Sequence, residues 1–100
     1  MHKIVVPSLN ADVREVRVLE WHCQPGDHFD AGELIVELET HKVVIEVRAV
    51  KAGWLRAILA EAGAWAGLDG PIALVSDDAE EPLTQDLGQA TTFAVDFTLD

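Results

Sequence analysis

The stretch VELETHKVVIEV, residues 36–47, decides the fold. Apolar and polar residues alternate up to Glu39, and a β-branched run follows Lys42. Alternation with a period of two is typical of half-buried strands, and β-branched residues disfavour helix because their χ1 angles are restricted. The stretch therefore predicts two strands joined by a tight turn, with Lys42 exposed at the turn and His41 directly before it.

The residues before this hairpin carry further strand and turn signals. VREVRVLEW (13–21) alternates as a half-buried strand does. QPGD (24–27) favours a tight turn, because Pro25 presets φ and Gly26 tolerates positive φ. A second turn is expected at 31–32, where the next alternating segment starts.

Strict alternation over ELIVELE (33–39) assigns its side chains to two faces. One face would carry Ile35, Glu37 and Glu39, and the other Leu34, Val36 and Leu38. Together with Glu46 of the following strand, the glutamates predict a solvated acidic face that partners can read. We do not interpret these carboxylates as catalytic.

The segment WLRAILAEAGAWAGL (54–68) is ambiguous from its period alone. Its apolar residues also satisfy a helical spacing, whereas glycines at 53, 63, 67 and 70 interrupt it, and each costs about 1 kcal/mol inside a helix relative to alanine. A faint internal repeat argues for strands. A shift of 37 positions lays residues 16–38 over 53–75, with Gly26 on Gly63 and Ile35 on Ile72. Two such halves predict a symmetric all-β sandwich with Lys42 at the crossover.

Composition excludes several kinds of partner. Seven basic and eighteen acidic residues give a net charge of −11, which repels nucleic acid and anionic membrane surfaces. We expect protein partners with basic patches instead. Cys23 is the single cysteine, so no intrachain disulfide can form, and with no export signal at the N-terminus we expect a cytoplasmic location.

No metal site is expected from the histidines and the cysteine. His22 and Cys23 are adjacent, and neighbouring residues of a strand point to opposite faces, so a joint site is not predicted. We expect His2 and His28 at the surface, and His22 either at the surface or packed against neighbouring side chains. The three tryptophans, Trp21, Trp54 and Trp65, are expected in the core or at its rim.

The composition changes after Val75. We interpret residues 1–76 as one folded domain and the acidic, proline-bearing residues 77–90 as a flexible linker. The last segment, 91–100, alternates Phe93, Val95, Phe97 and Leu99 with polar or small residues. It is expected to be an extra strand that pairs with a sheet edge.

These features together resemble the lipoyl domains of 2-oxo acid dehydrogenase complexes. The chain is most similar to the subfamily found in the dihydrolipoyl succinyltransferase component of the 2-oxoglutarate dehydrogenase complex, over about three quarters of its length. The most specific element is ETHK (39–42) followed by VVIEV (43–47), which is similar to the family pattern E-T-D-K followed by V-V. A biotin carrier domain is the less favoured interpretation, because the lysine of biotin carriers lies in an A-M-K-M context and no methionine flanks Lys42.

The resemblance implies a flattened barrel or sandwich of two four-stranded antiparallel sheets with pseudo-twofold symmetry. It also implies that Lys42 carries covalently attached lipoate, and that the domain itself contributes no catalytic residue. The residues that partners would recognise around this lysine are Glu39, Thr40, His41 and Val43, together with Asn10 and Asp12 from an earlier loop.

The implied partners are a lipoate-attaching enzyme, a thiamine-dependent 2-oxo acid decarboxylase, a dihydrolipoyl acyltransferase and dihydrolipoyl dehydrogenase. Two single positions and one short loop depart from the family pattern. His41 replaces an aspartate, Arg48 replaces a proline that is usual in the subfamily, and NAD (10–12) replaces the usual loop residues. Because His41 removes a fixed negative charge beside the lysine, an unmodified interaction module with the same fold is the alternative.

Overall fold

Strands make up all the regular structure of the described part of the chain. The computed structural model describes residues 1–6, 14–67, 70–82 and 91–99. In chain order the strands are β1 (His2–Val5), β2 (Glu15–Trp21), β3 (His28–Phe29), β4 (Leu34–Glu39), β5 (Val44–Ala49), β6 (Gly53–Ile58), β7 (Trp65–Gly67), β8 (Pro71–Ser76), β9 (Thr91–Thr92) and β10 (Val95–Leu99). Within these residues, no helix is long and apolar enough to span a membrane.

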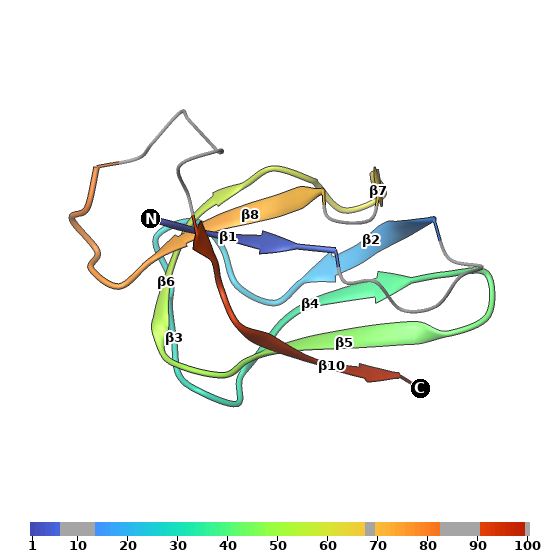
Figure 1. Cartoon of the computed structure of the whole chain (residues 1–100), viewed down its shortest axis with the longest axis horizontal. Coiled ribbons are helices and arrows are strands. Elements are labelled where there is room, and N and C mark those ends of the chain that lie inside the picture. Colours follow the sequence, from blue (N-terminus) through green and yellow to red (C-terminus); the bar gives the residue numbers. More distant parts are fainter. Residues whose placement is uncertain (7–13, 68–69, 83–90, 100) are drawn as a thin grey trace.

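The strands form two sheets that face each other across the core (Figure 1). One sheet has the order β3-β6-β8-β1-β9 and the other β10-β5-β4-β2-β7. All neighbours are antiparallel except β1 and β9, which run parallel. The predicted all-β sandwich is therefore confirmed. Each sheet has five strands instead of four, because the C-terminal segment adds β9 to one and β10 to the other.

The internal repeat is real. A shift of 37 residues places β4 on β8 residue for residue, and places β2 and β3 on β6 and β7 to within one residue at each end. The glycine turns obey the same symmetry. Gly26 donates its backbone N–H to the Leu55 carbonyl at 2.8 Å, and Gly63 donates to the Val18 carbonyl at 2.7 Å. Both glycines have positive φ, 99° and 91°, which explains why glycine stands at both turns.

The segment that was ambiguous between helix and strand forms β6, a turn and β7. The turn at Gly63 needs a backbone conformation that side chains with a Cβ rarely adopt, so a helix cannot continue through it. Trp65 of β7 is 60% exposed, while Trp21 is buried and donates its indole N–H to the Ala60 carbonyl at 2.8 Å. Trp21 is thus a core residue and Trp54 is half-buried, whereas the expectation that Trp65 lies in the core or at its rim was wrong.

A β-bulge changes one face assignment. The pairing of β4 with β5 shifts register between Leu34 and Val36. Such a shift breaks strict alternation, so that neighbouring side chains can both turn inward. Ile35 and Val36 are accordingly both fully buried, and the expectation that Ile35 shares the acidic face was wrong.

The C-terminal segment lies along the open side of the sandwich, between β1 and β5 (Figure 1). The Phe93 N–H bonds the Lys3 carbonyl at 2.8 Å, and the Phe93 ring packs edge-on against Phe29 at 5.7 Å between centroids. His2 bonds the Thr91 hydroxyl through Nδ1 at 2.5 Å and the Asp77 carboxylate through Nε2 at 3.1 Å. That hydrogen bond from His2 is the main reason why the pKa of Asp77 is lowered. These contacts join residues 91–93 to the folded unit.

Candidate functional site

The turn between β4 and β5 is organised by one hydroxyl group. Thr40 Oγ1 accepts hydrogen bonds from the backbone N–H groups of Lys42 and Val43, each at 3.2 Å. The Thr40 N–H in turn donates to the Val43 carbonyl at 2.9 Å. A side chain that bonds backbone groups two and three residues ahead closes a turn without glycine or proline. Thr40 therefore fixes the backbone on which Lys42 stands.

Lys42 projects from this turn into solvent. His41 and Lys42 are both exposed, whereas Val43 is half-buried and packs against the core. Among the residues that the structure describes, no hydrogen bond or ion pair holds the Lys42 ammonium group. The amine is thus accessible to solvent. The backbone that carries it is held by the β4–β5 pairing and by the packing of Val43 against the core.

The predicted recognition residues fall into two groups. Glu39, Thr40, His41 and Val43 surround Lys42 and, together with Val44, line a shallow polar depression at the tip. Glu39 is also ion-paired with Arg17 of β2, at 3.3 Å between Nη1 and Oε1. Asn10 and Asp12 lie outside the described residues. The four predicted recognition residues that the structure describes therefore form one continuous surface around Lys42.

The Thr40 hydroxyl gives a testable prediction. Thr40→Val keeps the shape of the side chain but removes the acceptor, so the amides of Lys42 and Val43 lose their partner. We expect faster hydrogen exchange at these two amides and a loss of about 1 kcal/mol in the free energy of unfolding. Thr40→Ser retains the hydroxyl and is expected to restore slow exchange. Unchanged exchange in Thr40→Val would show that the hydroxyl does not order the turn.

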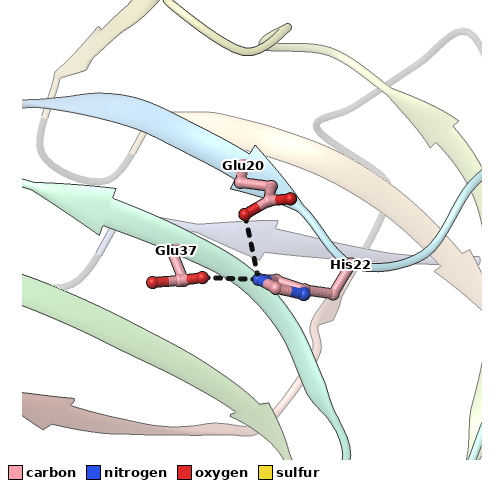
Figure 2. Close-up of side chains that lie close together, drawn as sticks. All are labelled: Glu20, His22 and Glu37. Atoms are coloured by element: carbon pink, nitrogen blue, oxygen red, sulfur yellow. Dashed lines mark hydrogen bonds and ion pairs between the residues drawn. The ribbon is translucent and has the colours of Figure 1, made fainter.

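Sequence reasoning missed a second cluster, on the outer face of β2 and β4. His22 is exposed and Cys23 buried, as alternation predicts. Burial, reinforced by nearby Asp27 and Glu33, raises the pKa of the Cys23 thiol to about 11. The His22 imidazole lies on the opposite face from Cys23, beside the carboxylates of Glu20 and Glu37 (Figure 2). The spacing Glu-x-His on one strand face was a readable signal, but the pairing of Glu20 with Glu37 depends on a register that the sequence does not reveal.

Known proteins resemble the chain over its first three quarters. The sequence model of the biotin/lipoyl family, described as "Biotin-requiring enzyme", matches residues 2–75. The succinyltransferase component of the 2-oxoglutarate dehydrogenase complex of Bacillus subtilis is 36% identical over 81 residues, which is 81% of this chain and 19% of that protein. The same component of Staphylococcus saprophyticus is 42% identical over 77 residues, 77% of this chain and 18% of that protein.

A solved structure shows the same arrangement of strands. The solution structure of the lipoyl domain of the 2-oxoglutarate dehydrogenase complex from Azotobacter vinelandii superposes with a TM-score of 0.67 at 29% identity. The match covers 76% of this chain and 96% of that domain. The chain therefore spans nearly the whole of that domain, but only about a fifth of the length of the curated relatives it matches.

Proposed function

Because the chain belongs to the biotin/lipoyl attachment family and has the fold of a lipoyl domain, we propose that it is a carrier whose Lys42 bears a lipoyl group. The observation that carries the proposal is the position of Lys42. It is exposed at the tip of a two-stranded hairpin, within the stretch ETHKVV that is similar to the family's attachment pattern. The relatives are components of the 2-oxoglutarate dehydrogenase complex, which supports a role in a complex of that type.

The residues of the tip fit a covalently attached group. An amide at Lys42 Nζ needs an amine that an attaching enzyme can reach, and the Lys42 side chain has no competing partner among the described residues. The half-buried Val43 and the Thr40 hydrogen bonds hold the backbone of the turn, and the Lys42 side chain extends from it into solvent. When attached, a lipoyl group supplies a disulfide that can accept an acyl group and electrons and be reoxidised.

The chain's own contribution is tethering and presentation. A group carried on Lys42 meets each partner site at a high effective concentration, because it remains bound to the protein. The net charge of −11 attracts partners with basic surfaces. The proposed partners are a lipoate-attaching enzyme, a thiamine-dependent 2-oxo acid decarboxylase, a dihydrolipoyl acyltransferase and dihydrolipoyl dehydrogenase. We propose the cytoplasm as the location of this exchange, which the single cysteine of the sequence supports, because it can form no intrachain disulfide.

The mass of the intact chain tests the proposal. The full chain is produced in a host that makes both lipoate and biotin together with their attaching enzymes, and its mass is compared with that of the unmodified polypeptide. We expect an increase of one lipoyl group, followed by acylation when a decarboxylase and its 2-oxo acid are added. An increase of one biotinyl group would assign a biotin carrier. An unchanged mass would favour the unmodified interaction module, for which the histidine at position 41 is the specific argument.

His41 gives a second prediction about attachment. His41→Asp places a fixed negative charge beside Lys42, as in the family pattern. An exposed charge pair contributes about 0.2–1 kcal/mol, so we expect lipoylation by a ligase that reads this carboxylate to accelerate by up to about fivefold. His28→Asp adds the same charge at a distant exposed position and serves as the matched control. Equal initial rates for His41→Asp and the parent chain would show that the ligase does not read this position.

A further inference from the structure

Three side chains with metal-binding donor atoms converge on the outer face of the second sheet (Figure 2). Glu20 lies on β2, His22 follows directly after that strand, and Glu37 lies on β4. His22 Nε2 is 2.6 Å from Glu37 Oε1 and 3.9 Å from Glu20 Oε2. One donor atom from each of the three residues lies within 4.8 Å of the other two.

The backbone holds these residues together. Glu20 and Glu37 are direct partners in the β2–β4 pairing, and the His22 N–H bonds the Ile35 carbonyl at 2.8 Å. This bond holds the backbone of His22 beside β4, so the imidazole starts from a fixed position next to the two carboxylates. Side-chain exposure is 31% for His22, 26% for Glu37 and 68% for Glu20, so the group is reachable from solvent while two of its members are partly immobilised.

The carboxylates that lie next to one another on β2, β4 and β5 favour a bound cation. Glu37 faces Glu20 on one side and Glu46 of β5 on the other, which puts three carboxylates side by side across adjacent strands. Like charges directly opposite each other destabilise a sheet. Arg48 pairs with Glu46 at 3.5 Å and relieves one end of the row. At the other end, only the His22 imidazole faces Glu20 and Glu37 among the pairs that the structure describes.

We propose that Glu20, His22 and Glu37 form a binding site for a divalent transition-metal ion of the Zn²⁺ class. Zinc takes imidazole nitrogen and carboxylate oxygen at about 2.0–2.2 Å in a tetrahedral arrangement, which puts donor atoms about 3.3 Å apart. The two distances to His22 Nε2 bracket this separation, so the side chains of the exposed Glu20 and the half-buried Glu37 need to rotate only slightly to reach it. Three protein ligands leave the fourth position to water. The imidazole selects against Mg²⁺ and Ca²⁺, which prefer oxygen donors alone.

The site does not use Lys42, Thr40 or the other residues of the hairpin tip. Its test is therefore independent of whether the chain carries a lipoyl group. To keep the dithiol of such a group out of the measurement, the unmodified full chain is used, without a histidine tag. Zn²⁺ is titrated in competition with a chromophoric chelator, and the binding site is located by amide chemical-shift changes.

We expect one Zn²⁺ per chain, with shift changes centred on residues 20, 22 and 37. His22→Gln and Glu37→Gln are each expected to weaken binding at least tenfold, since loss of even an outer-shell partner costs about 10–100-fold. His28→Gln and Cys23→Ser are the matched controls, and they are expected to bind as the parent does. Two independent ligand variants keep the test decisive if one of them folds poorly by circular dichroism.

Several results would overturn the assignment. One is no saturable Zn²⁺ binding by the parent chain, and another is undiminished binding by both ligand variants. Equal weakening in His28→Gln or Cys23→Ser would place the ion elsewhere. Saturable binding of Mg²⁺ as tight as that of Zn²⁺ would show a general attraction of cations to the acidic face, without a built site.

Discussion

Lys42→Arg is expected to abolish covalent attachment completely and to leave the fold unchanged. A guanidinium group keeps the positive charge and the approximate reach of lysine, but it stays protonated and cannot act as the nucleophile that forms the amide. The substitution therefore removes the nucleophile and keeps the positive charge that a partner could recognise. Because Lys42 is exposed and holds no partner among the described residues, the free energy of unfolding should change by less than about 0.5 kcal/mol.

The measurement is the mass of the intact variant together with peptide mapping of the parent. Lys3 and Lys51 remain in the variant and act as internal controls. The Lys51 ammonium group lies 3.7 Å from the Asp77 carboxylate and 5.5 Å from the centre of the Phe93 ring, and neither Lys3 nor Lys51 stands at a hairpin tip. A persistent increase of one lipoyl group in Lys42→Arg would move the attachment site to one of them and remove the basis of the proposed function.

The sequence predicted the hairpin and the two-sheet arrangement because both depend on local signals. Alternation before Thr40 and the β-branched run after Lys42 define two strands, and the turn residues between them leave Lys42 outside. The weak repeat was informative because its two glycines, Gly26 and Gly63, share a backbone conformation that few other residues adopt. Lys42 and the candidate residues 39–41 and 43 are therefore contiguous in sequence as well as in space, whereas Asn10 and Asp12 lie outside the described residues.

Features that depend on register could not be predicted in the same way. The bulge beside Ile35 turns two successive residues inward, and period-two reasoning has no means of placing such an insertion. The Glu20–His22–Glu37 cluster depends on which residue of β4 faces Glu20, and a one-residue slip would move Glu37 to the other face. Long-range pairing, not propensity, decides both.

Phe93→Ala is expected to lower the free energy of unfolding by about 3–5 kcal/mol, which is the usual cost of truncating a buried phenylalanine. The Phe93 side chain is 2% exposed and packs on Phe29 inside the sandwich, although residue 93 lies beyond the stretch that the family's sequence model matches. Domains of this size are stable by only about 5–15 kcal/mol, so the loss is a large fraction of the total. The cost is large because the Phe93 side chain fills part of the core, although residue 93 lies in the segment that connects β9 and β10.

Urea unfolding measures the loss in the free energy of unfolding and the interaction between the two rings. It is carried out on the parent, Phe93→Ala, Phe29→Ala and the double variant. An edge-on aromatic pair adds about 0.5–1.5 kcal/mol beyond buried area, so the double variant should lose less than the sum of the single variants by that amount. Phe97→Ala, at a half-buried position of β10, is the control and should cost less than Phe93→Ala. If Phe93→Ala unfolds at the same urea concentration as the parent, the C-terminal segment is not part of the core and the domain is complete without it. If the full cost is observed, the two added strands are integral to the carrier, and β10 supports β5 up to Ile45, three residues from Lys42.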